Sequence, residues 1–185
     1  MWGTGMGDDP LLAPLPPDRW DDSIRELAGD FAGRLNVYRL MAHDPDLLAA
    51  WAPLRAHVVT GSALGPERLE IVVLRTAARL GVTYEWAHHI DRAGKLGMDP
   101  DRLRTVAGTP EAMRDDDALL ARIVDDLLDT GRIAPARVAA FRALAGKAAF
   151  LDLIATVGFY TTLGAMLTTF DVPLGAGIEP TDIPT

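Results

Sequence analysis

The sequence predicts an all-α protein, and three observations lead to this expectation. From residue 21 onward, apolar residues recur with the 3.6-residue period of a helix over most of the chain. No segment alternates cleanly between apolar and polar residues, and the β-branched runs are short. Proline and glycine separate the periodic segments at positions that are typical of helix ends. At 185 residues and 49% apolar composition, the chain suits one domain with a sizeable core.

The expected elements follow in chain order. Residues 1–20 are rich in Gly, Pro and Asp and are predicted to form an extended N-terminal arm, which leaves 21–185 as a single all-α domain. The tail after Asp171 is predicted to be extended again. Helices are expected at about 22–43, 45–59, 66–80, 84–96, 99–107, 115–130, 134–147 and 149–169.

The segment from Phe150 to Phe170 is long enough to cross a membrane. It contains Asp152, several threonines and two glycines, and it lacks basic anchors on one consistent side. We therefore expect a helix that is buried on most faces, either in a core or between subunits.

Composition excludes several functional classes. The net charge of −8 argues against a nucleic-acid or anionic membrane partner. The chain contains no cysteine, which rules out disulfides, thiolate metal sites and thiol redox chemistry. The N-terminal residues lack the pattern of a signal peptide, so a cytoplasmic location is expected. The acidic triplet 115–117 is interpreted as a solvated helix start.

The helix expected at 66–80 carries a carboxylate that should point inward. Pro66 suits its first position and Gly81 suits its C-terminal cap. Three arginines gather on one side of the helix, whereas Glu70 lies on the opposite side among apolar residues. An unpaired buried charge costs several kcal/mol, roughly, so Glu70 must find donors or take up a proton.

The stretch "VTYEWAHHIDRAG", residues 82–94, is the densest group of chemically active side chains. Thr83 is a plausible N-cap for the helix that follows. Glu85 and His89 share one stripe along the border of the apolar face, to which Trp86 belongs, and His88 is expected to point to the solvated side. The polar face is expected to hold Tyr84, His88, Asp91, Arg92 and Lys95.

Glu70, Glu85 and His89 should therefore converge across the Gly81 turn. The helix dipole should favour Glu85 as the anion, whereas apolar surroundings should raise the pKa of Glu70. Two carboxyl groups with separated pKa values beside a histidine are suited to acid–base chemistry. A structural interpretation stays open, because inward His and Glu side chains also occur as satisfied core residues. The histidines at 43 and 57 are interpreted as structural.

The segment "ERLEIVVLRTAARLGVTYEWAHH" resembles the signature helix pair of the carboxymuconolactone decarboxylase and alkylhydroperoxidase D superfamily. That pattern is a Glu, a Cys-x-x-Cys that begins twelve positions later, and a His four residues after the second Cys. Glu70 and His89 match, whereas Val82 and Glu85 stand at the two cysteine positions. Residues 35–54 and 153–174 are similar to further helices of the superfamily, the latter to the subgroup with Tyr-Glu-Trp in place of Cys-x-x-Cys.

The resemblance implies an alkylhydroperoxidase D-like helical bundle that forms a homo-oligomer, often a trimer or hexamer, with sites near subunit interfaces. It implies no metal and no organic cofactor. Without thiols, the peroxide-reducing cycle of part of the superfamily is not available to this chain.

Our first hypothesis is a cofactor-free lyase that acts on a small carboxylated lactone or keto-acid-like compound. His89 would give and accept the proton, Glu85 would orient His89 or relay its proton, and Glu70 would complete the relay. The candidate substrate-binding residues are Tyr84, Trp86 and His88. An isomerase or hydrolase would use the same groups, so the reaction and the substrate stay open.

Two other hypotheses belong to different classes. The second hypothesis is metal binding, since Glu85-x-x-His88 matches the Glu-x-x-His unit of di-iron bundles, but no second copy exists. The four histidines could still hold one zinc ion, although their spacing predicts no specific metal site. Alternatively, the chain is a non-catalytic helical oligomer that binds a small molecule. Neither a nucleic acid nor a membrane is an expected partner.

Overall fold

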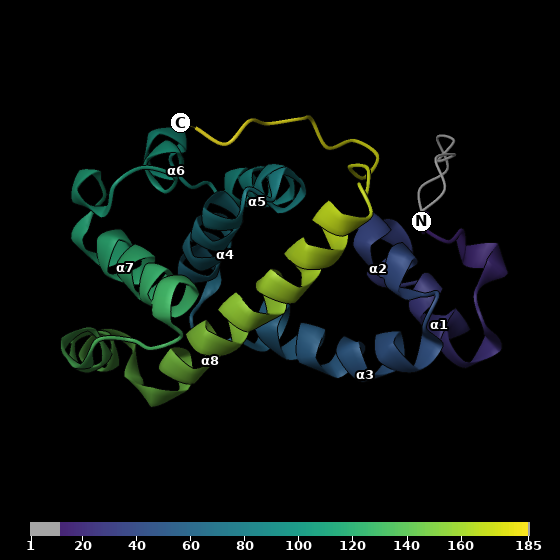
Figure 1. Ribbon diagram of the computed structural model, residues 1–185, viewed down its shortest axis with the longest axis horizontal. Helices are drawn as coiled ribbons and strands as arrows, with labels where there is room; N and C mark the ends of the chain where they lie inside the picture. Colours follow the sequence, from purple (N-terminus) through teal and green to yellow (C-terminus); the bar gives the residue numbers. More distant parts are fainter. Residues whose placement is uncertain (1–11, 185) are drawn as a thin grey trace, which may run out of the picture.

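The computed structural model describes residues 12–184, and the regular elements in this part of the chain are all helical (Figure 1). The predicted all-α fold class is thus confirmed. The α-helices are α1 (Arg25–Ala28), α2 (Asn36–Met41), α3 (Pro45–Ala56), α4 (Pro66–Leu80), α5 (Thr83–Lys95), α6 (Pro100–Thr105), α7 (Asp115–Thr130) and α8 (Pro135–Thr169). Short 3-10 turns occur at Pro17–Arg19, Asp22–Ile24, Ala32–Arg34 and Pro110–Ala112, and a π-helical turn at His57–Gly61 follows α3.

Helices α4 and α7 begin and end at the predicted residues. Pro66 occupies the first turn of α4, where its missing N–H costs nothing, and Gly81 ends the helix in the left-handed region with φ 68°. Gly131 ends α7 in the same way. Helix α5 begins one residue earlier than predicted, because Thr83 is its first helical residue and Val82 stands at the N-cap position.

The single helix predicted for 22–43 is wrong, because this stretch is broken into α1, α2 and two 3-10 turns. Leu35 is extended, with φ −113° and ψ 124°, and so interrupts the helical path before α2. Gly33 is required where the chain turns, because a Cβ there would lie 2.0 Å from the backbone oxygen of Ala28. The break thus depends on close backbone packing.

Helix α8 runs diagonally across the molecule and joins the two helices predicted at 134–147 and 149–169 (Figure 1). The break predicted between them lies at Gly146, whose φ of 84° and ψ of −179° are not helical. By length and composition α8 could cross a membrane, and half of its most apolar window is buried within the described structure. A core helix of a soluble protein passes the same test.

Helix α4 is the centre of the fold, because it packs against α5, α7 and α8. Every residue from Leu69 to Ala77 is buried, so polar side chains on all its faces need partners inside the protein. Arg75 is one of them, and its donors reach Asp125 of α7 and the backbone oxygens of Val106 and Gly108.

The acidic start of α7 is not entirely solvated. Asp117 is buried and accepts two hydrogen bonds from the Arg102 guanidinium of α6. The interpretation of the whole triplet 115–117 as solvated is therefore wrong at Asp117, since α6 folds back over the first turn of α7.

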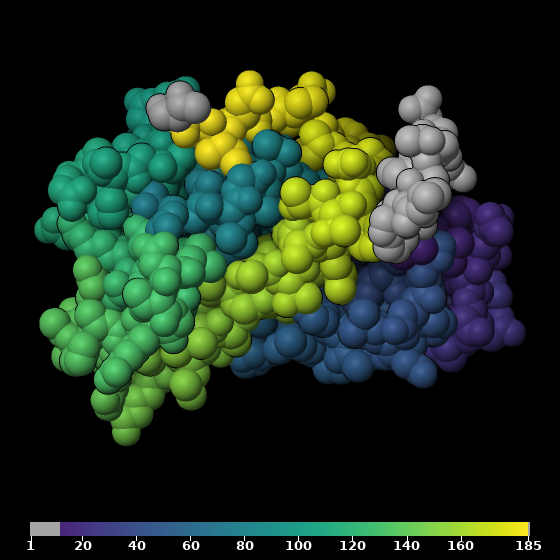
Figure 2. All heavy atoms as spheres, in the orientation of Figure 1, coloured from purple at the N-terminus to yellow at the C-terminus, as the bar shows by residue number. Residues whose placement is uncertain are grey.

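The two ends of the described chain both lie against the helices. Residues 1–11 of the predicted arm lie outside the described residues, and Trp20 is buried, with its indole N–H donating to the backbone oxygen of Leu15. After α8 the C-terminal tail, residues 171–184, is extended as predicted and crosses above α5 (Figures 1 and 2). The Asn36 side chain donates hydrogen bonds to the backbone oxygens of Pro173 and Leu174 and so holds the start of the tail in place.

Candidate functional site

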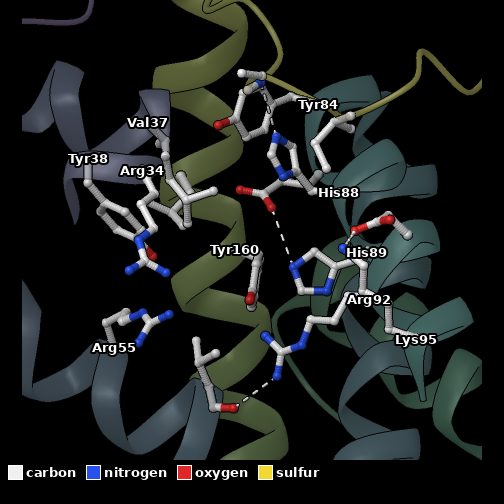
Figure 3. Close-up of a pocket in the computed structure, with 18 residues that line it drawn as sticks. Arg34, Val37, Tyr38, Arg55, Tyr84, His88, His89, Arg92, Lys95 and Tyr160 are labelled. Carbon is white, nitrogen blue, oxygen red and sulfur yellow. Dashed lines mark hydrogen bonds and ion pairs between the residues drawn. The ribbon is translucent and has the colours of Figure 1, made fainter. Parts of the chain in front are cut away.

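A cavity of about 450 Å³ lies between α2, α3, α5, α8 and the C-terminal tail (Figure 3). This volume is in the usual range for a small-molecule site. Helix α5 supplies one wall, and α2 and the end of α3 supply the facing wall. The polar residues that line the cavity are Arg34, Tyr38, Arg55, Tyr84, Glu85, His88, His89, Asp91, Arg92, Lys95 and Tyr160.

His89 and Glu70 form a buried pair at the back of this cavity. The Nδ1 atom of His89 lies 2.6 Å from Oε2 of Glu70, whose side chain is completely buried. Arg92 places its Nε atom 2.8 Å from the other carboxylate oxygen. A carboxylate that is paired with a guanidinium accepts hydrogen bonds, so Nδ1 carries the proton and donates. This leaves Nε2 of His89 with its lone pair available, as a general base requires.

Glu70 does not lie in the purely apolar surroundings that the sequence suggested. Arg92 reaches it from α5, although the helical wheel assigned Arg92 to the solvated face. Arg92 follows His89 by three positions, so the two side chains lie on neighbouring parts of the same face. Its guanidinium also donates to the backbone oxygen of Val59 in the π-helical turn, which fixes it across the cavity floor. The spacing of three was the only signal in the sequence that pointed to this residue.

Glu85 is the carboxyl group with the perturbed protonation equilibrium. Burial raises its pKa to about 7, and Glu70 acts in the same direction, whereas the charge of His89 opposes the rise. The prediction that the helix dipole keeps Glu85 anionic is therefore wrong, because desolvation outweighs the dipole. The Oε2 atom of Glu85 lies 3.6 Å from Nε2 of His89, which is too far for a hydrogen bond.

Tyr84 and His88 form the rim of the cavity beneath the tail. Their rings stack at 4.3 Å, and the backbone N–H of Gly175 points to Nε2 of His88 at 3.4 Å. The expectation that His88 is solvated is wrong in part, because the tail partly covers this side chain. Burial lowers the pKa of His88 to about 4, so this histidine is neutral at pH 7. The Tyr84 hydroxyl lies near the backbone of Asn36 and Val37, but not at hydrogen-bonding geometry.

Trp86 lies outside the cavity. It is fully buried on the other side of α5, where it lines a separate apolar hollow with Met98 and with Thr181 of the tail. Its predicted place on the apolar face of the helix is confirmed. For the same reason, it is not in a position to contact a ligand beside His89.

The cavity also contains groups from other segments that the pattern of α5 could not reveal. Tyr160 of α8 is buried, and its ring meets the ring of His89 edge to face at 5.0 Å. Burial raises the pKa of Tyr160 and of Tyr38 well above the ordinary value, so both phenols remain protonated donors. Arg34 and Arg55 add two positive charges to the facing wall. These residues come from distant segments and carry no local sequence signal.

The remaining histidines lie elsewhere. His57 pairs with Asp152 of α8 at 2.8 Å, and His43 bonds to the backbone oxygen of Ala13, also at 2.8 Å. Across residues 12–184, no three His, Asp or Glu side chains are arranged so that they could hold a metal ion.

Comparison with known proteins gives a family match over part of the chain. The model of the carboxymuconolactone decarboxylase family matches residues 45–123, which include Glu70, Glu85 and His89. A search of the curated proteins finds no match.

Two solved structures share the fold over nearly the whole chain. An uncharacterized peroxidase-related protein from Silicibacter has a TM-score of 0.75 at 14% identity, covering 94% of this chain and 97% of its own. An alkylhydroperoxidase AhpD core protein from Ralstonia eutropha, also described as peroxidase-related, has a TM-score of 0.74 at 16% identity, covering 89% and 93%. At these identities the likeness concerns the fold, and the predicted alkylhydroperoxidase D-like architecture is confirmed.

Proposed function

Because the model of the carboxymuconolactone decarboxylase family matches residues 45–123, we propose that the chain is a cofactor-free acid–base enzyme of that type. Its substrate would be a small carboxylated lactone or keto-acid-like compound. One observation carries the proposal: the buried pair of His89 with Glu70, which Arg92 anchors and which leaves Nε2 of His89 available beside a cavity.

His89 would move the proton at carbon. Nε2 takes a proton from a carbon next to a carbonyl group, or returns one to it, and the Glu70 carboxylate stabilises the imidazolium that forms. Arg92 keeps Glu70 in place by binding its second oxygen. Positioned proton transfer of this kind contributes about 10²- to 10⁴-fold to the rate.

Glu85 would serve as the acid rather than as a link in the relay. With a pKa near 7, it holds a proton in a large fraction of molecules at neutral pH. It can therefore donate to a carbonyl or enolate oxygen on the substrate. In a decarboxylation, the carbon–carbon bond breaks and CO2 leaves with its oxygens. His89 first takes up a proton from solvent at Nε2. The electron pair of the broken bond moves into the dienolate, Glu85 stabilises the dienolate oxygen, and the imidazolium of His89 then gives that proton to carbon and returns to the neutral form.

Thiol peroxidase activity is not part of this proposal. The two structural neighbours are described as peroxidase-related, but this chain contains no cysteine. Val82 and Glu85 stand where the family's redox pair would be, and neither side chain can be oxidised and reduced in such a cycle.

Turnover of a substrate panel tests the proposal. The panel contains carboxylated γ-lactones and β-keto acids, and product formation is followed by NMR and by CO2 release. We expect His89→Gln to lower kcat by about 10²- to 10⁴-fold. His43→Gln, an exposed histidine outside the cavity, is the matched control and should retain full activity.

An unchanged rate in His89→Gln contradicts the proposal. So does the absence of turnover across the panel when the His89 resonances show that ligands enter the cavity. That second result supports a non-catalytic binding protein instead.

We also propose that the chain works as a homo-oligomer, with a trimer or hexamer as the expected states. Exposed apolar side chains on α8 support this idea, since Leu151 is 66% and Ile154 38% exposed. Light scattering during size-exclusion chromatography tests it, and a monomer at micromolar concentration would contradict it.

A further inference from the structure

Two arginines on the facing wall of the cavity have no carboxylate partner among residues 12–184. Arg34 precedes α2 and Arg55 lies near the end of α3, and both line the cavity. The other two cations there are already neutralised, since Arg92 pairs with Glu70 and Lys95 pairs with Asp91. The facing wall therefore has an excess of positive charge that the described chain does not balance.

Arg55 is held in one orientation, and no carboxylate of the described residues pairs with its guanidinium. Its guanidinium carbon lies 4.2 Å from the centre of the Phe31 ring, so the planar group stacks on the aromatic face. Its Nε atom is buried without a hydrogen-bond partner. A buried donor without an acceptor is unfavourable, so the described residues do not satisfy the full hydrogen-bonding capacity of this guanidinium.

We propose that Arg55 and Arg34 form an anion subsite that binds a carboxylate of the substrate. This inference rests on the proposed function and names the part of the substrate that the cavity recognises. A guanidinium presents parallel N–H groups that match the two oxygens of a carboxylate. A cavity of about 450 Å³ limits the ligand to a small molecule.

The carboxylate bound there is one that the reaction leaves intact. Figure 3 shows Arg34 and Arg55 on one side of the cavity and His89 on the other, with Tyr160 between them. An ion pair with arginine stabilises a carboxylate as the anion, and that stabilisation is lost if the group leaves as CO2. The subsite therefore holds one end of the substrate and directs the reacting carbon toward His89. A substrate that is decarboxylated here must carry a second carboxyl group.

Binding of matched acids and esters tests the subsite. The probes are 5-oxotetrahydrofuran-2-carboxylate, glutarate and 2-oxoglutarate, each compared with its methyl ester by calorimetry. Shifts of the His88 and His89 ring signals report entry into the cavity. We expect at least one acid to bind about tenfold or more tightly than its ester, because charge-assisted hydrogen bonds form only with the acid.

Three substitutions test whether Arg55 and Arg34 cause the preference for the acid over its ester. Arg55→Gln should remove the difference between acid and ester, and Arg34→Gln should reduce it. Arg142→Gln removes an exposed arginine of α8 outside the cavity, so it should leave the difference unchanged. The inference is overturned if no acid binds better than its ester, if Arg55→Gln keeps the preference, or if Arg142→Gln loses it equally.

Failure of the subsite can be distinguished from failure of the proposed function. His89→Gln should still prefer the acid, because the arginines do not depend on His89. If acids bind through Arg55 and nothing in the panel is turned over, the subsite stands and the catalytic proposal fails. If turnover depends on His89 and Arg55→Gln leaves KM unchanged, the catalytic proposal stands and the subsite fails.

Discussion

Helix α4 takes part in two buried ion-pair networks. One has a structural role, whereas we propose a catalytic role for the other. On the side of α7, Arg75 donates hydrogen bonds to both carboxylate oxygens of Asp125 and to the backbone oxygens of Val106 and Gly108. Toward α5, Glu70 binds His89 and Arg92, but Nε2 of His89 is left over and borders a cavity. Both networks contain buried charged side chains, Arg75 in the first and Glu70 with His89 in the second. What differs is that the first is saturated and closed, whereas the second keeps an unused reactive atom next to open space.

The largest expected effect concerns the closed network. Arg75→Met should lower the free energy of unfolding by about 3–5 kcal/mol, because it removes one partner of a buried pair and leaves Asp125 and two backbone oxygens undersatisfied. Denaturant titration measures the loss. Activity per folded molecule should stay the same. Arg79→Met, which removes the half-exposed neighbour on the same helix, is the control and should cost about 1 kcal/mol or less.

Substitutions in the network around Glu70 and His89 should change the reaction rate more than the free energy of unfolding. Glu70→Gln should lower kcat by about 10²-fold or more, because the neutral amide no longer stabilises the imidazolium of His89. Glu67→Gln, at the exposed start of the same helix, is the control. A loss of stability with an unchanged kcat per folded molecule would show that Glu70 is only structural.

The protonation of Glu85 should appear in the pH dependence of stability. Its pKa is about 7 in the folded protein and ordinarily 4.5, so its stabilising contribution is complete below pH 4.5 and is lost as the pH rises toward 7 and above. The full difference is about 3 kcal/mol. Glu85→Gln should therefore become more stable than the parent protein at pH 8, as measured by chemical denaturation across pH. Glu26→Gln, an exposed carboxylate, should leave the pH profile unchanged.

Substitution of His88 should give the smallest change in stability. The stabilising contribution of His88 is lost as the pH falls, whereas that of Glu85 is lost as the pH rises. The pKa of His88 is lowered from 6.5 to about 4, so its contribution is present above pH 6.5 and is lost as the pH falls toward 4. Because this side chain is only partly buried, we expect His88→Gln to reduce the acid-side loss by about 1 kcal/mol. His43→Gln is the exposed control. If both variants behave alike between pH 4 and pH 6.5, the tail does not cover His88 in solution.

Much of the scaffold could be predicted from the sequence because it depends on local chemistry. Pro66 and Gly81 define the ends of α4 by their allowed dihedral angles, and these ends were found at the predicted residues. The helical period also sufficed to turn Glu70 inward, since the side on which a residue lies depends only on its own helix. Resemblance to the family then selected the same side chains.

The remaining features of the site could not be predicted, because they depend on which distant segments pack against each helix. A helical wheel states which way His88 points, but not that the tail from Gly175 will cover it. It places Trp86 on the apolar face, but not on the side of α5 that faces away from the cavity. A helical wheel of α5 could not reveal Tyr160 or Arg55, because these residues lie on other helices and contacts between distant segments leave no periodic pattern in the sequence.

The division between sequence and tertiary structure is clearest at the two carboxyl groups. The sequence by itself determined that Glu70 and Glu85 lie on adjacent helices joined at Gly81, and that His89 lies one turn beyond Glu85. Only the tertiary structure decided their electrostatics. Arg92 folds inward and pairs with Glu70, whereas the burial of Glu85 outweighs the opposing charge of His89, so the pKa of Glu85 rises to about 7. Protonation depends on everything that surrounds a group in space, and this information is not carried by spacing along the chain.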